Sequence, residues 1–309
     1  MAIEPSSPDG LRPEDMVPSD LEARKRKSVF VRLFRGSGGV AVVILGLIVL
    51  SGIFAPFLAP FEPEFGNLRE SLLPPGSPAK DSSIPYFLGT DRFGRDVLSR
   101  VIYGSRVSLA VAAMAVAVAG TLGTTIGIVA GYYGGVVDSI LMRLADLVLA
   151  MPIILLALVL AVLVGPSFFN VVLILGAVLW AEYARQARAE TLGIREREYV
   201  LLAEVAGISS IGIMVRHILP NILDTLLVLA TLQVARVIII EAALSFLGVG
   251  IPPPAPAWGL MVSEGRGLLN TSWWISVFPG IAITMTILTV NLIADRLKDI
   301  LDPHGKVVG

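Results

Sequence analysis

Few side chains in this sequence could do chemistry, and they lie in two places. Arg236 and Glu241 stand inside an apolar segment, and a charged stretch, 195–221, lies between two long apolar segments. There is no cysteine, and the two histidines, His217 and His304, lack the spacing of metal ligands. No Walker-type phosphate-binding loop and no paired nucleophile and base are present. We therefore expect no catalytic site, no metal and no cofactor in this chain.

The composition is that of a membrane protein. Of the 309 residues, 55% are hydrophobic and only 16% are charged, with a mean hydropathy of +0.79. Soluble domains carry about 25% charged residues, and a soluble core of this size could not bury so much apolar side chain. The net charge of −1 provides no field that would attract nucleic acid.

Six apolar segments are long enough to cross a membrane as helices, which takes about 20 residues each. The first is long for a signal-peptide core and further spans follow it, so we interpret it as a retained span. The predicted fold class is an all-α membrane protein with six transmembrane helices. The predicted spans are 38–60, 107–131, 144–164, 168–187, 222–247 and 275–294.

Lysine and arginine set the predicted orientation, because loops that stay in the cytoplasm carry an excess of them. With both termini inside, 16 of the 24 Lys and Arg residues lie on the cytoplasmic side. Residues 1–37 are polar and rich in Pro and Ser, which is typical of a disordered cytoplasmic tail. The other predicted regions are the first helix 38–60, an extracytoplasmic segment 61–106, a transmembrane domain 107–297 with a loop 189–221, and a cytoplasmic tail 298–309.

Arg236 and Glu241 are costly inside a membrane unless they face a bundle interior or a cavity. They are five residues apart and do not share a helix face, so each is expected to find a partner on another helix or a sibling subunit. They either line a polar passage or form structural pairs between helices. Arg143 and Asp146 are expected to pair locally, and the charges at 182–188 are interpreted as interface charges.

Gly123, Gly127 and Gly131 repeat at four-residue spacing within the second predicted span. Small residues at this spacing let two membrane helices approach closely, so the repeat predicts a tightly packed bundle. The alternative is the general glycine richness of membrane helices.

The stretch 195–221 is patterned as two short helices. Gly207 stands where the first would end, Ser209 or Ser210 could cap a second turn, and Pro220 would stop that turn. We predict a rigid two-helix knuckle that protrudes into the cytoplasm; the alternative is an amphipathic helix on the lipid surface. The residues expected to share one face of the first helix are Tyr199, Leu202, Ala203 and Ala206.

This stretch resembles the "EAA" loop of bacterial ABC-importer permeases, in which Glu-Ala-Ala, three residues and Gly precede nine residues and Ile-x-Leu-Pro. The matching positions are Ala203, Gly207, Leu219 and Pro220, whereas Leu201, Leu202 and His217 replace the Glu, the first Ala and the Ile. The resemblance implies a coupling helix that docks on an ATPase subunit, with Glu204 or Glu198 replacing the usual Glu. The implied coupling residues are Tyr199, Val200, Leu201, Leu202, Ala203, Glu204, Gly207, Leu219 and Pro220.

Three further segments, Phe87–Ala112, Glu241–Arg266 and Leu297–Lys306, resemble the C-type permease subunit of dipeptide, oligopeptide and nickel importers. The resemblance implies a type I ABC-importer permease fold in the bacterial inner membrane. Implied partners are a homologous permease subunit in a heterodimer, ATPase subunits that bind ATP and Mg, and an extracytoplasmic substrate-binding protein. The residues expected to contact that binding protein are Asp91, Arg95, Asp96 and Trp258.

The implied cargo is a dipeptide or oligopeptide, and nickel or another small solute is the alternative. A secondary transporter would need coupling-ion sites in the membrane, for which Glu241 is the only strong candidate. A membrane-embedded enzyme would need clustered polar groups inside the spans, and the sequence has none.

Overall fold

The computed structural model describes residues 37–301, except residue 81. The predicted tail 1–37, apart from Ser37, lies outside the described residues, as do His304 and the end of the chain from residue 302. The described helices are α2 (Ser37–Ile53), α3 (Ala55–Leu58), η2 (Leu68–Glu70), α4 (Val97–Tyr133), α5 (Gly135–Leu149), α6 (Ile153–Val164), α7 (Phe168–Arg195), α8 (Glu198–Val205), α9 (Ser210–Ile213), η3 (Met214–Ile218), α10 (Leu219–Phe246), α11 (Trp258–Gly265), η4 (Arg266–Leu268) and α12 (Trp274–Leu301).

The described chain is an all-α membrane protein, but six spans are not confirmed. Four helices are long and apolar enough to cross a membrane: α4, α7, the continuous helix Ser210–Phe246 and α12. The predicted span 144–164 is not one straight helix, because α5 and α6 are bent by 91°. Pro152 lies at this bend, where its fixed φ and missing N–H disfavour helix continuation. The first span corresponds to α2, which has 17 residues.

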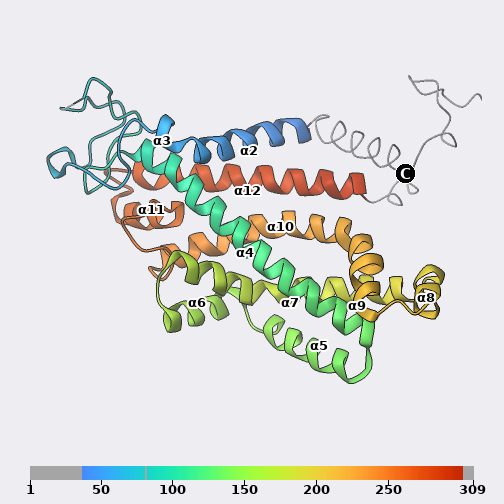
Figure 1. Ribbon diagram of the computed structural model, residues 1–309. Helices are drawn as coiled ribbons and strands as arrows, with labels where there is room; N and C mark the ends of the chain where they lie inside the picture. Colours follow the sequence, from blue (N-terminus) through green and yellow to red (C-terminus); the bar gives the residue numbers. More distant parts are fainter. Residues whose placement is uncertain (1–36, 81, 302–309) are drawn as a thin grey trace, which may run out of the picture.

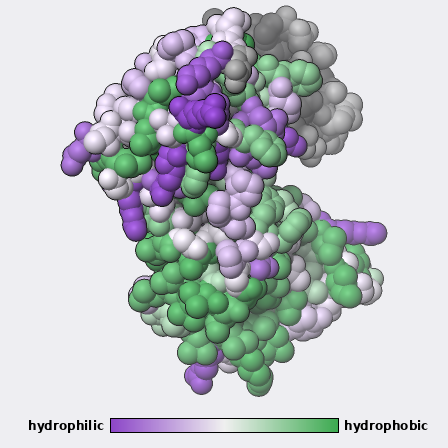
Figure 2. Space-filling view, turned by 90° about the vertical axis from the view of Figure 1, so that its left-hand side faces the viewer, coloured by the Kyte–Doolittle hydropathy of each residue, from purple (hydrophilic) through white to green (hydrophobic). Residues whose placement is uncertain are grey.

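The long helices lie roughly side by side, and the two ends of the bundle differ (Figure 1). At one end, the knuckle end, α8 extends beyond the other helices. At the other, the loop end, residues 61–96 (here called the cap) lie beside α11. Figure 2 shows that polar side chains gather over the part of the loop end where the cap lies, whereas apolar side chains cover the part near α6.

Helix α4 packs along α7 through the predicted glycine repeat. A Cβ at Gly123 would lie 2.2 Å from the carbonyl oxygen of Trp180, and one at Gly127 would lie 2.4 Å from that of Ala184. A Cβ at Gly131 would meet Cβ of Thr191 at 2.8 Å. These approaches leave no room for a side chain, so the prediction of close helix packing at this repeat is confirmed.

Replacing Gly123 with alanine is expected to lower the thermal stability of the protein. The new methyl group would strike the backbone of α7, and overpacking of this kind costs typically about 1–3 kcal/mol. The measurement is the midpoint of thermal unfolding in detergent. Gly193→Ala is the matched control, because a Cβ there meets nothing within 4 Å. Equal midpoints for the two variants would show that the α4–α7 contact is not as tight as described.

Candidate functional site

The knuckle, now defined as α8, Gly207 and α9, has the predicted helix–glycine–helix form. Gly207 takes a φ of +79°, and its N–H donates to the carbonyl of Glu204 at 3.0 Å. This left-handed residue closes α8, and glycine adopts the conformation without the strain of a Cβ. Ser209 caps α9 by accepting the N–H of Gly212 at 3.3 Å. Of the two serines considered, Ser209 is therefore the cap.

The sequence predicted that Tyr199, Leu202, Ala203 and Ala206 share one face of α8, and this prediction is wrong in part. Val200 and Ala203 are buried against the bundle, whereas Leu202 and Ala206 are exposed. Leu202 is 67% exposed and Val205 is 86% exposed. Exposed apolar side chains that gather on one short segment are typical of interaction surfaces. The exposed apolar residues of the knuckle and its glycine turn, here called the knuckle patch, are Leu201, Leu202, Val205, Ile208 and Ile211.

Helix α9 does not stop at Pro220, contrary to the prediction. A π-helical turn, Met214–Ile218, joins α9 to α10 without a break, so that one helix runs from Ser210 to Phe246. Pro220 lies in the first turn of α10, and the wider π turn before it accommodates a residue that has no N–H. The knuckle is thereby continuous in the chain with a membrane helix, α10.

Charges on α7 pair with other helices, which sequence reasoning missed. Arg185 contacts Asp146 of α5 at 2.6 Å, so the predicted local partner of Asp146, Arg143, is wrong. Arg188 pairs with Asp138 of α5. The signal available in the sequence was the helical spacing of these charges along 182–188, which places them on neighbouring turns of one helix.

Arg236 and Glu241 have separate partners. Arg236 pairs with Glu182 of α7, as expected for a partner on another helix. Glu241 is buried and accepts a hydrogen bond from Ser245 of its own helix at 2.7 Å and one from Ser108 of α4 at 3.4 Å. Of the two, Arg236 keeps part of its side chain exposed and Glu241 does not.

At the loop end, a buried charge cluster joins the cap and α4 to α11. Arg95 contacts Asp91 at 2.6 Å and Glu264 at 3.1 Å. Arg100, whose side chain is 1% exposed, lies 3.3 Å from Glu264 and 3.7 Å from Asp91. Two carboxylates thus face two guanidinium groups. Arg100 was not among the predicted site residues, although it follows Arg95 by five residues in the same polar stretch.

The four residues predicted to contact a binding protein are buried within the chain, which corrects that prediction. Asp91 and Arg95 belong to the charge cluster. Asp96 caps α4 by accepting the N–H of Ser99 at 2.7 Å. Burial raises the pKa of Asp96, and the hydrogen bonds from Ser99 oppose this. The indole N–H of Trp258 donates to the carbonyl of Val101 at 2.9 Å, so all four side chains position the cap and α11 instead.

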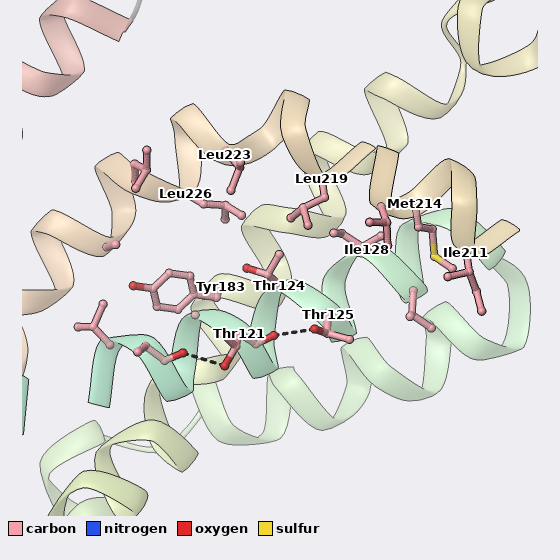
Figure 3. A pocket seen from close by; sticks show the side chains of 17 residues that line it. Thr121, Thr124, Thr125, Ile128, Tyr183, Ile211, Met214, Leu219, Leu223 and Leu226 are labelled. Atoms are coloured by element: carbon pink, nitrogen blue, oxygen red, sulfur yellow. Dashed lines mark hydrogen bonds between the residues drawn. The ribbon is translucent and has the colours of Figure 1, made fainter. Parts of the chain in front are cut away.

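A mostly apolar groove of about 550 Å³ runs between α4 and α10 and has the knuckle at one end (Figure 3). Leucines of α10 form one wall, and Thr121, Thr124 and Thr125 of α4 form the other. Tyr183 reaches the groove from α7, and its hydroxyl is buried without a hydrogen-bond partner in the part of the chain that the structure describes. The groove was not predicted, because its walls come from helices far apart in the sequence.

The part of the chain that the structure describes contains no group of three or more His, Asp or Glu side chains that could hold a metal ion. His217 lies in the π-helical turn with its ring 6.4 Å from that of Tyr199. The candidate site consists of the exposed knuckle patch, ion pairs between helices and the groove.

Two family profiles match the sequence. The profile described as "binding-protein-dependent transport system inner membrane component" matches residues 123–306. The profile described as "N-terminal TM domain of oligopeptide transport permease C" matches residues 37–75. Together they include the glycine repeat, the knuckle, α2 and the α10 wall of the groove.

Relatives in other bacteria match over most of the chain. The dipeptide transport system permease protein of Escherichia coli K12 is 43% identical over 273 residues, which are 88% of this chain and 91% of that protein. The dipeptide transport system permease protein of Haemophilus influenzae is 39% identical over 272 residues, covering 86% and 90% of the two chains. The di/tripeptide transport system permease protein of Pseudomonas aeruginosa is 37% identical over 269 residues, covering 87% and 88%.

Proposed function

Because the chain belongs to the binding-protein-dependent inner membrane components, and among them to the C-type permease subunits of peptide ABC importers, we propose that it forms half of an import pathway for dipeptides and oligopeptides. A sibling permease subunit supplies the other half of the pathway in a heterodimer. ATPase subunits bind ATP and Mg and perform the hydrolysis, and this chain performs none.

The observation that carries the proposal is the knuckle patch. Leu202 and Val205 point away from the bundle on a short helix that Gly207 closes and that Val200 and Ala203 hold against the core. An apolar patch on a rigid projection fits a groove on another protein, which here is the ATPase subunit. Because α9 continues into α10, closure of the ATPases on ATP would tilt a helix that lines the groove.

The orientation follows from the same assignment. The ATPase subunits are cytoplasmic, so we place the knuckle end and both termini in the cytoplasm of a bacterial cell with the protein spanning its inner membrane. The loop end then faces outward and receives the substrate-binding protein. The buried cluster of Asp91, Arg95, Arg100 and Glu264 holds the cap in the form that the binding protein meets.

Peptides are the better supported cargo. Of the relatives described above, two are named for dipeptides and one for di/tripeptides, and none is named for nickel. The described residues also offer no cluster of metal-ligating side chains. Nickel or another small solute is therefore the second candidate, without an observation that favours it.

The assembly is tested by purifying the tagged chain from its native membrane in mild detergent and identifying what co-purifies. We expect a second permease subunit and ATPase subunits, and we expect the knuckle-patch variant Val205→Asp to lose the ATPase subunits alone. A buried charge introduced at an apolar interface is costly, which is the reason for the loss. Recovery of the chain as a stable homo-oligomer without ATPase subunits would contradict the proposal.

A further inference from the structure

The groove between α4 and α10 contains one polar group that the chain itself does not satisfy. Tyr183 is 1% exposed, and its hydroxyl has no hydrogen-bond partner among the described residues. A buried hydroxyl without a partner costs on the order of 1–3 kcal/mol. The ring is held in place because Gly123 of α4 packs on its Cβ, so the side chain is fixed where it meets the groove.

A second unsatisfied group lies close to the same end of the groove. Gln233 stands one helical turn beyond Ala230, the last groove residue on α10. Its side-chain N–H donates to Glu182 at 2.6 Å, but its carbonyl oxygen is buried without a partner among the described residues. Glu182 adjoins Tyr183 on α7 and also pairs with Arg236. A hydroxyl, an amide carbonyl and an ion pair therefore lie within neighbouring turns of α7 and α10.

We propose that Tyr183 and Gln233, beside the Glu182–Arg236 pair, form a polar station that hydrogen-bonds a peptide as it passes along this groove. This inference rests on the proposed function. A peptide brings backbone N–H and C=O groups that need partners in an apolar passage, and its two ends carry opposite charges. The hydroxyl can donate or accept, the amide oxygen can accept, and the ion pair offers a charge to each end.

The surroundings of the station suit a transient rather than a tight contact. The rest of the groove is lined by aliphatic side chains, one methionine, small residues and three threonines. The hydroxyls of Thr121 and Thr125 already donate within their own helix. Among the groove residues that the structure describes, Tyr183 carries the buried polar atom without a partner. A passage needs a site favourable enough to enter and weak enough to leave, as one or two neutral hydrogen bonds provide.

The hydroxyl is tested by Tyr183→Phe in proteoliposomes that contain the whole importer and its binding protein. We expect peptide uptake to fall roughly three- to tenfold, as the loss of one hydrogen bond would produce. Thermal stability should rise, because the variant removes a buried hydroxyl without a partner, and assembly should be unchanged. Tyr103→Phe on α4, away from the groove, is the matched control. Unchanged uptake in Tyr183→Phe, with wild-type uptake intact, would overturn the inference and leave the proposed function standing.

The ion pair is tested by Arg236→Gln, which separates a transport role from a structural one. A structural role predicts that assembly and binding-protein-stimulated ATP hydrolysis fall together with uptake. The station predicts that uptake falls while stimulated hydrolysis and peptide affinity of the binding protein persist. If wild-type proteoliposomes accumulate no peptide at all, the proposed function itself fails.

A single introduced cysteine distinguishes a peptide from a helix of the sibling subunit as the occupant. The natural chain has no cysteine, so Thr125→Cys places one thiol on the groove wall. We expect a small water-soluble thiol reagent to label it and peptide with binding protein to slow the labelling. Absence of labelling, or labelling that peptide does not slow, would show that the groove does not admit peptide.

Discussion

Gly207→Pro is expected to reduce ATP-driven peptide uptake by at least about tenfold. The protein should still insert into the membrane and pair with its sibling permease subunit. Proline fixes φ near −65°, whereas Gly207 has a φ of +79°. The substitution also removes the N–H that donates to Glu204. Both changes misplace α8 relative to α9, so the knuckle patch no longer presents one surface.

The measurement is uptake of a labelled dipeptide together with the rate of ATP hydrolysis in the same proteoliposomes. Hydrolysis should become independent of uptake, because the ATPases lose their mechanical connection to α10. Gly207→Asn is the matched control, since asparagine tolerates a positive φ, and it should retain most of the uptake. Normal uptake by Gly207→Pro would show that the knuckle does not couple the two activities.

Arg100→Leu is expected to be strongly destabilising. It leaves Asp91 and Glu264 buried with one guanidinium group, Arg95, between them. Removing one partner of a buried ion pair costs about 3–5 kcal/mol, because a charge is left uncompensated. The midpoint of thermal unfolding in detergent should fall by roughly 10 °C. Adding Glu264→Gln to the variant restores the balance of charge and should recover part of the loss.

Arg69→Leu is the control, since Arg69 lies on the same cap and is exposed. Exposed substitutions change stability by about 0.5 kcal/mol or less, so its midpoint should match that of the wild type. If Arg100→Leu behaves like Arg69→Leu, or if Glu264→Gln worsens it, the cluster does not hold the cap and α11 together.

Local features were predictable from the sequence where a single residue type determines the backbone conformation or caps a helix. Gly207 ends α8 because only a left-handed residue closes the helix there, and Ser209 caps α9. The glycine repeat on α4 predicted close helix packing, since small residues at four-residue spacing leave a smooth helix face, and the structure shows that α7 is the helix that packs there. These signals are local, and tertiary packing did not change them.

Features that depend on packing between distant segments were not predictable. The pairing of Asp146 with Arg185 and the burial of Asp91 and Arg95 depend on which helices become neighbours. Periodicity alone placed Leu202 and Ala203 on one face of α8, but the bundle contacts only Ala203 and Val200. The unsatisfied hydroxyl of Tyr183 is likewise a property of the assembled fold.

The most direct test of the account is accumulation of a labelled dipeptide by proteoliposomes that contain this chain, its co-purifying permease and ATPase subunits, and the binding protein. We expect accumulation that requires ATP, the binding protein and this chain. We also expect Val205→Asp to abolish it. Accumulation driven by an ion gradient without ATP, or full ATP-driven uptake by a complex that lacks this chain, would contradict it.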